Sequence, residues 1–340
     1  MRIREIEYLR GLAIMAVVAI HVTALGMTQN FSTFDIFINL VSRFSVPLFL
    51  FIAGIVFIYK YDEKTFSYRK FITKRLKDIG IPYLIWSFIG FTMFLIGNPF
   101  SIRELLLTFL LGSGRLFYHL YYIPLLFQCY FLLPLVLKYI DKKYFVLGTG
   151  LLQTSILFVY QTSFLQGNHI IPGFLVQVFV GSWFFYFVLG CRIGKNLNKW
   201  TKKIQEMRLS LVTGLFLFGT MVQFSDFYFS WKVTSNYADS SNFLRPSIIL
   251  YFLLSLPFLY RVSNIAPLKR IMYKIGEHSF SIYLGHLLVI IAAHSYISPW
   301  NIFFISIVIC ISAHMIYLKL LPRLLRRKGS PAINVIRKTS

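Results

Sequence analysis

The hydrophobic pattern of the chain consists of long apolar segments separated by short polar segments that are mostly basic. Several apolar segments have about 18–24 residues with almost no charge, which is long enough for an α-helix to cross a bilayer. We therefore predict an all-α, polytopic transmembrane helical bundle of about ten spans. The predicted spans are 8–28, 36–59, 79–97, 115–138, 144–160, 173–194, 209–225, 246–261, 278–296 and 300–321.

Two further segments predict helices that do not cross the membrane. Residues 101–111 are apolar but too short to span, and Ser101 followed by Glu104 forms a capping-box pattern, so this helix should lie at the surface. In the basic loop 60–78, apolar residues recur at helical spacing with basic residues largely on the other sides. This pattern predicts an amphipathic helix on the inner leaflet, or alternatively a binding surface for an anionic substrate from the cytosol.

Composition and charge exclude a soluble protein and set the orientation. The 340 residues are 57% hydrophobic and 14% charged, with a mean hydropathy of +0.66. The net charge of +23 does not indicate nucleic-acid binding, because 29 of the 35 Lys and Arg residues fall on one side of the predicted topology and four on the other. The positive-inside rule then predicts a multi-pass cell-membrane protein with both termini in the cytosol. We expect a membrane domain over 1–322 and a short basic cytosolic tail over 323–340.

The first span carries polar groups that are costly in hydrocarbon. Arg10 and His21 are 11 residues apart, so on a helix they point within about 20° of each other and lie about 16 Å apart along the axis. Glu7 is three residues before Arg10, within reach of an ion pair. Such a face is expected to look into the bundle or into a wet cavity rather than toward lipid.

A second cation should lie at the depth of His21. Arg43 is about seven residues from the outer end of span 2, and His21 is about seven residues from the outer end of span 1. Antiparallel neighbours would place the two side chains at similar height. A neutral base beside a fixed cation can deprotonate a hydroxyl and stabilise the oxyanion of a tetrahedral intermediate.

The remaining polar residues inside the spans have two open interpretations. His119, in LFYHLYYIPLL, and the group Ser279, Tyr283 and His286, in GEHSFSIYLGHLL, either serve a site or form interhelical hydrogen bonds. No spacing of His, Cys or carboxylates indicates a metal site, and no glycine-rich nucleotide motif is present. Transport driven directly by ATP is therefore not expected.

Taken together, these motifs resemble the acyltransferase-3 family of integral membrane acyltransferases. The resemblance rests on the arginine-x10-histidine pattern from Arg10 to His21 and on four further elements spread over most of the chain. These elements are RFSVPLFLFIAG (43–54), KRLKDIGIP (74–82), HLYYIPLL (119–126) and SFSIYLGH (279–286). Tyr121 stands where the family usually has tryptophan, a departure that bears on acceptor specificity.

The resemblance implies transfer of an acyl group, commonly acetyl, from cytosolic acyl-coenzyme A to a hydroxyl of a sugar or polysaccharide. It implies that His21 is catalytic and that Arg10 handles or positions the donor, with Arg43 and Arg75 as further candidates. Acyl-coenzyme A would be a co-substrate, with no permanently bound cofactor and no metal. We predict these partners together with the lipid bilayer, and no nucleic acid. The candidate catalytic residues are His21, Arg10 and Arg43, and the candidate donor- or acceptor-binding residues are Arg75, His119, Tyr122, Ser279, Tyr283 and His286.

Two questions stay open at this level. A polysaccharide or lipid-linked sugar exporter without covalent chemistry would also suit ten spans with a polar interior, and the chain more loosely resembles the membrane protein of biofilm poly-N-acetylglucosamine operons. The aromatic segment FSDFYFSW (224–231) is either an acceptor platform on the outer side or an ordinary interfacial aromatic belt.

Overall fold

The computed structural model describes residues 4–26, 32–168, 171–263 and 265–327. Within these ranges every regular element is a helix and none is a strand, as predicted. The α-helices are α1 (Arg4–Gly26), α2 (Thr33–Val41), α3 (Ser45–Lys60), α4 (Tyr68–Arg75), α5 (Ile81–Leu95), α6 (Ile102–Leu106), α7 (Tyr122–Phe131), α8 (Leu133–Tyr139), α9 (Lys143–Leu165), α10 (Gly173–Val178), α11 (Phe184–Gly194), α12 (Leu197–Glu206), α13 (Leu209–Thr234), α14 (Tyr237–Ser240), α15 (Pro246–Ser263), α16 (Ala266–Glu277), α17 (Ser279–Ala293) and α18 (Pro299–Arg327). Short 3₁₀ or π segments are η1 (Ser42–Phe44), η2 (Leu76–Gly80), η3 (Leu107–Leu111), η4 (Tyr118–Tyr121) and η5 (Val180–Ser182).

Seven helices in the described residues are long and apolar enough to cross a membrane, and nine spans result if each of two bent helix pairs is one crossing. Each of these nine overlaps one of the ten predicted spans, although the second bent pair begins at Leu268, before the predicted span 278–296. Their outward faces carry exposed apolar side chains such as Leu151 and Phe158 on α9 and Phe304 on α18, which a bilayer would cover. The bundle is therefore built for a membrane, as predicted from its hydropathy.

The predicted span 173–194 is not one continuous helix. It is divided into α10, η5 and α11, and the last of these has 11 residues. The amide group of Gln128 makes this break possible, because it donates to the carbonyl oxygen of Val178 (2.8 Å) and accepts from the backbone N–H of Val180 (3.1 Å). A side chain on α7 thus replaces the helical hydrogen bonds that the backbone loses.

The second span is one helical segment, Thr33–Lys60, that tightens into a 3₁₀ turn at Arg43. Helix α2 ends at Val41, the 3₁₀ turn η1 contains Arg43, and α3 continues the span to Lys60. The carbonyl oxygens of Leu40 and Val41 accept hydrogen bonds from Gln223 (2.7 Å) and from the Tyr251 hydroxyl (2.6 Å). Side chains from α13 and α15 therefore fix the turn that positions Arg43.

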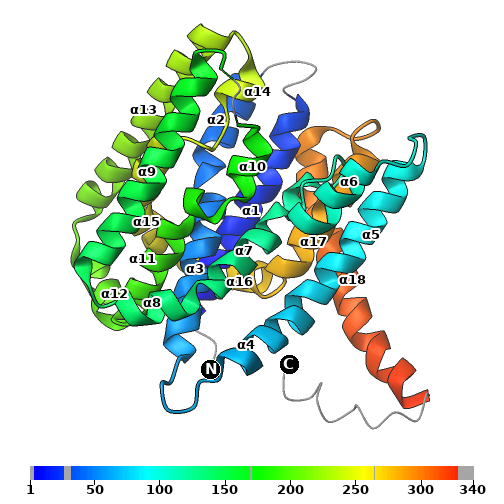
Figure 1. Ribbon diagram of the computed structural model, residues 1–340, viewed down its shortest axis with the longest axis horizontal. Coiled ribbons are helices and arrows are strands. Elements are labelled where there is room, and N and C mark those ends of the chain that lie inside the picture. The colour runs from blue at the N-terminus through cyan, green and yellow to red at the C-terminus, as the bar shows by residue number, and fades with distance from the viewer. Residues whose placement is uncertain (1–3, 27–31, 169–170, 264, 328–340) are drawn as a thin grey trace.

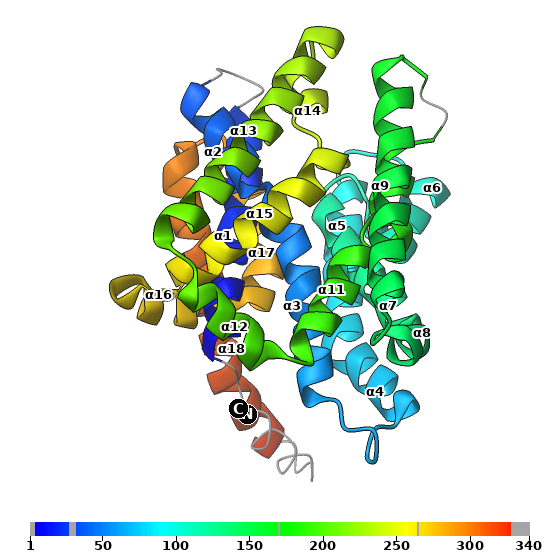
Figure 2. The same cartoon turned by 90° about the vertical axis from the view of Figure 1, so that its left-hand side faces the viewer.

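Helices α1 and α3 run through the middle of the bundle, with α9 and α13 on one side and α5 and α18 on the other (Figure 1). Glycines permit the closest approaches. A Cβ at Gly190 would overlap the carbonyl oxygen of Phe51, which brings α11 against α3, and a Cβ at Gly276 would overlap that of Glu7, which brings α16 against α1. Figure 2 shows α1 and α3 between α16 and α9 in the perpendicular view.

The smaller predicted helices are present, with one change in detail. Residues Tyr68–Leu95 form one long helical segment whose first part, α4, is the predicted basic helix after loop 60–67. Ser101 caps α6 by accepting from the backbone N–H of Glu104, as predicted. The carboxylate of Glu104 does not complete the capping box but accepts from the backbone N–H of Arg115 at 2.6 Å.

Helix α1 begins and α18 ends at the same end of the bundle (Figure 1), whereas residues 328–340 of the predicted tail lie outside the described residues.

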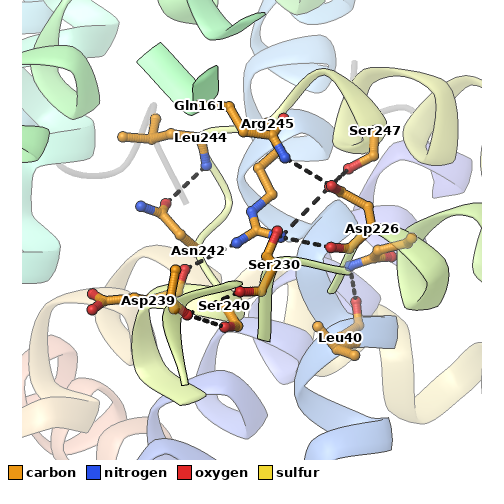
Figure 3. Close-up of polar contacts among 12 residues, drawn as sticks. Leu40, Gln161, Asp226, Ser230, Asp239, Ser240, Asn242, Leu244, Arg245 and Ser247 are labelled. Atoms are coloured by element: carbon orange, nitrogen blue, oxygen red, sulfur yellow. Dashed lines mark hydrogen bonds and ion pairs between the residues drawn. The ribbon is translucent and has the colours of Figure 1, made fainter. Parts of the chain in front are cut away.

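A buried ion pair joins three helices near the predicted outer end (Figure 3). Arg245 lies 3.6 Å from the Asp226 carboxylate and donates to Ser230 Oγ at 2.9 Å. The same carboxylate accepts from Gln161 on α9 (2.7 Å) and from Ser247 on α15 (2.5 Å). One acidic group therefore ties α9, α13 and α15 together and holds the segment that carries Phe243, which lines the site described below.

We expect Asp226→Asn to destabilise the protein, because an amide has one acceptor oxygen for the two hydrogen bonds from Gln161 and Ser247 and no charge to pair with Arg245. The loss should be about 1.5–3 kcal/mol, the usual contribution of a hydrogen bond to a charged group. A thermal unfolding assay of the detergent-solubilised protein measures it. Asp239→Asn is the matched control, since Arg245 bonds only to the backbone carbonyl of Asp239 (3.0 Å). Equal melting temperatures for the two variants would contradict the role of the Asp226 carboxylate in holding α9, α13 and α15 together.

Candidate active site

Two adjoining cavities lie between α1, α3, α7 and α17. The inner cavity, about 240 Å³, is lined by Arg10, Arg75 and Ser279 among others. The outer cavity, about 70 Å³, is lined by His21 and Arg43 among others. Three side chains line both cavities: Phe49, Tyr122 and Tyr283.

The inner cavity contains two cations with different surroundings. Arg10 forms the predicted ion pair with Glu7, with Nη1 at 3.0 Å from Oε1. Arg75 lies over the rings of Phe71 (5.1 Å) and Tyr130 (5.9 Å) and has no carboxylate partner among the described residues. An unpaired guanidinium on aromatic faces remains able to bind a phosphate in its plane.

The outer cavity places His21 and Arg43 in one chamber, as their predicted depths required. His21 Nδ1 lies 3.0 Å from the hydroxyl of Tyr118, so Nε2 is the ring nitrogen left for chemistry. Arg43 lies over the ring of Phe243 at 5.8 Å and has no ion-pair partner in the described part of the chain. The chamber therefore offers a base and an uncompensated cation.

Asn39 sets the position of Arg43 relative to helix α1. Arg43 donates to Asn39 Oδ1 at 2.5 Å, and the amide nitrogen of Asn39 donates to Thr23 Oγ1 (2.9 Å) and to the carbonyl oxygen of Ile20 (3.2 Å). Ile20 is the neighbour of His21 in sequence. This chain of hydrogen bonds was not predicted, because Asn39 and Thr23 are ordinary polar residues near the ends of their spans.

Three imidazoles gather at this depth. The ring of His21 lies 5.1 Å from that of His286 and 6.0 Å from that of His119, and the latter two lie 4.9 Å apart. His286 lines neither cavity but is completely buried behind them. The structure thus brings residues from α1, η4 and α17 into one cluster.

Backbone carbonyls fix the proton on two of these rings. His119 Nε2 lies 3.0 Å from the carbonyl oxygen of Tyr283, and His286 Nδ1 lies 2.9 Å from those of Ile282 and Tyr283. A carbonyl oxygen only accepts, so these nitrogens carry the hydrogens. His119 Nδ1 and His286 Nε2 are then unprotonated, and both are buried without a partner among the described residues. These nitrogens can accept a hydrogen bond from His21 only when its Nε2 carries a proton.

No group of three or more His, Cys, Asp or Glu side chains in the described ranges is arranged to hold a metal ion. Outside the cluster, His278 and His314 pair through their Nδ1 atoms at 2.9 Å, and His294 bonds within its own helix. These three histidines have contacts of the interhelical or local kind.

Two aromatic residues of the outer cavity, Trp183 and Phe243, were not predicted, and Tyr121 was noted only as the residue that replaces the family's usual tryptophan. Tyr121 stacks on Phe243 with ring centroids 6.1 Å apart, and Trp183 lies 5.6 Å from Phe243. These rings come from η4 and from the segments before α11 and α15. The segment 224–231 instead continues helix α13 beyond its predicted end and lines neither cavity.

All nine predicted site residues fall in this region. Arg10, Arg75 and Ser279 line the inner cavity, His21, Arg43 and His119 line the outer one, Tyr122 and Tyr283 line both, and His286 packs behind the outer cavity. Sequence reasoning missed Phe49, Tyr118, Asn39, Trp183 and Phe243. Tyr118 and Phe49 lie within quoted motifs, but nothing in the sequence separates Phe49 from its neighbouring apolar residues, and Asn39, Trp183 and Phe243 give no signal.

A family model described as an acyltransferase domain matches residues 3–321, which is nearly the whole chain. The chain belongs to the acyltransferase-3 family. This confirms the family resemblance seen in the motifs, and it makes the protein a membrane acyltransferase.

A relative in Bacillus subtilis (strain 168) agrees with this membership of the acyltransferase-3 family. It is named "Putative membrane-bound acyltransferase YfiQ", and it is 26% identical over 311 residues, which cover 84% of this chain and 80% of the relative. No solved structure matches the chain.

Proposed function

We propose that this acyltransferase-3 protein moves a short acyl group, such as acetyl, from cytosolic acyl-coenzyme A to a hydroxyl of a cell-surface sugar or polysaccharide precursor. One observation carries the proposal. A cation-lined cavity adjoins a cavity that contains a base and an unpaired cation, and three side chains are common to both.

The inner cavity suits the donor. Coenzyme A carries phosphates, and Arg75 and Arg10 lie at this cavity on the side where most basic residues are predicted. Within the described part of the chain no carboxylate at Arg75 competes with a phosphate, in contrast to Arg10, which Glu7 partly neutralises. The donor would bind with its phosphates at Arg75 and its thioester directed toward the shared side chains.

His21 acts as the general base in this proposal. Its Nε2 accepts the proton of the acceptor hydroxyl while the hydroxyl oxygen attacks the thioester carbonyl carbon. For this, Nδ1 carries a proton and donates it to the Tyr118 oxygen, 3.0 Å away. The carbon–sulfur bond then breaks, and the departing thiolate of coenzyme A takes the proton from His21, which restores the base.

Arg43 stabilises the oxyanion in the same step. The tetrahedral intermediate carries negative charge on the former carbonyl oxygen, and a fixed cation in a dry chamber lowers its energy most strongly there. Asn39 holds Arg43 against α1, so the guanidinium needs little reorganisation during the reaction. The rings of Tyr121, Trp183 and Phe243 add aromatic faces to the outer cavity, whose volume of about 70 Å³ admits the acceptor hydroxyl but not a whole sugar ring.

The test is acyl incorporation in membranes from cells that produce the protein. Labelled acetyl-coenzyme A is supplied, and label is followed into extracted glycan and compared with membranes that contain the His21→Ala protein. In parallel, the glycan of a deletion strain is analysed chemically. Loss of ester groups from a glycan that is still exported supports the transferase. An unchanged ester content, with the glycan retained inside the cell, would refute the transferase in favour of export.

A further inference from the structure

The inner and outer cavities are separated by a wall of three aromatic side chains. Phe49 on α3, Tyr122 on α7 and Tyr283 on α17 line both cavities. Their rings are in contact, with centroids 6.0 Å apart for Phe49 and Tyr122 and 5.8 Å apart for Tyr122 and Tyr283. These rings therefore lie between the inner cavity with Arg10 and Arg75 and the outer cavity with His21.

The wall has one fixed member and two that are held only by packing. The Tyr283 hydroxyl donates to the carbonyl oxygen of His119 at 2.7 Å, and the Tyr283 carbonyl accepts from His119 and His286. The Tyr122 hydroxyl has no hydrogen-bond partner among the described residues, and Phe49 has no polar group. Phe49 and Tyr122 also pack against both hydrophobic clusters of the bundle, so they lie at the seam between them. Such side chains can change rotamer without breaking a hydrogen bond.

The space beyond the wall is small. The outer cavity measures about 70 Å³, whereas a cavity of about 150 Å³ is the size that holds one benzene molecule. A two-carbon acyl group fits the smaller space beside His21, and an eight-carbon chain does not. Bulk at the wall would therefore discriminate among donors before any chemistry occurs.

We propose that Phe49 and Tyr122, set against the fixed ring of Tyr283, form a gate that admits only short acyl groups from the inner cavity to His21. The inference rests on the proposed function and adds to it the residues that restrict the donor to coenzyme A thioesters of about two to four carbons. Phe49 lines both cavities and is the specificity-determining residue of this proposal. It is also the gate residue to substitute in a test, because its ring can be shortened without removing a polar group.

The test compares donors of different length on the full-length protein in membranes that contain the native acceptor. Release of free coenzyme A is followed with a thiol reagent for acetyl-, butyryl- and octanoyl-coenzyme A, and the His21→Ala background is subtracted. We expect the wild type to favour acetyl over octanoyl by about a hundredfold or more in kcat/KM, and Phe49→Leu to reduce this preference by about tenfold.

Phe51→Leu is the matched control. It is the same substitution on the same helix, but Phe51 lines neither cavity and packs against Phe252 and Trp200. Its preference should equal that of the wild type, and comparable amounts of the two variants on size-exclusion chromatography show that both fold. A wild type that uses octanoyl- as well as acetyl-coenzyme A, or a Phe49→Leu preference that does not change, overturns the gate while leaving the transferase intact. Absence of release from every donor refutes the proposed function itself.

Discussion

Replacing His21 with alanine will reduce acyl transfer by a factor of about 10²–10⁴, the usual contribution of a positioned general base. The imidazole lines the outer cavity, with Nδ1 held by Tyr118 and with Nε2 free to accept a proton. In its absence the acceptor hydroxyl must lose its proton to water in a chamber that is mostly apolar. The rate of label transfer from acetyl-coenzyme A in membranes measures the loss.

His294→Ala is the matched control for this variant. His294 is an exposed histidine that bonds only to its chain neighbours Ile291 and Ser295, so its removal should leave the rate unchanged. A further variant, Tyr118→Phe, removes the group that holds Nδ1 but leaves the imidazole in place. It should retain more activity than His21→Ala, because it disturbs only the orientation and tautomer of the base. A His21→Ala protein with wild-type activity would exclude general-base catalysis by this residue.

The second large effect is expected from Arg43→Met, which should lower kcat by about 10²–10³ with a much smaller change in the KM for the donor. The split follows from the proposed role, because the oxyanion exists in the transition state and not in the bound thioester. Methionine keeps much of the apolar stem that packs near Phe243 but removes the charge. Steady-state kinetics with varied acetyl-coenzyme A separate the two parameters.

Lys232→Met serves as the control for a lost cation on the same side of the bundle. Lys232 lies over the exposed rings of Tyr228 and Trp231 and lines neither cavity. The kcat of Arg43→Lys should lie between those of the wild type and Arg43→Met, since lysine keeps the charge but not the planar guanidinium that contacts Asn39. A variant Arg43→Met that raises only the KM would place this cation in donor binding and contradict its role in the transition state.

The sequence predicted the helices and the polar face of α1 because both depend on local patterns. Long apolar segments must be helical in a bilayer, and residues 11 positions apart must share a helix face. The common depth of His21 and Arg43 followed from counting residues in two antiparallel spans. None of these inferences required knowledge of how the helices are rotated against one another.

The unpredicted features depend on that rotation. Spans that are apolar on all sides do not reveal which face is buried, because lipid and protein interior are similarly apolar. Phe49 therefore looks like any other phenylalanine of α3, and Asn39 and Gln128 reveal their roles only when a partner helix is in place. The glycines at 190 and 194, with three residues between them, were a usable sequence signal for close helix packing, since both lie against the backbone of α3.

The central claim of this account is that the donor enters by the inner cavity from the cytosol and that its acyl group passes inward to His21. Sealed membrane vesicles of opposite orientation test it directly, because labelled acetyl-coenzyme A does not cross the bilayer. The account predicts rapid acyl incorporation in inside-out vesicles, none above the His21→Ala background in intact right-side-out vesicles, and recovery when the latter are permeabilised. Equal incorporation in intact vesicles of both orientations would contradict it.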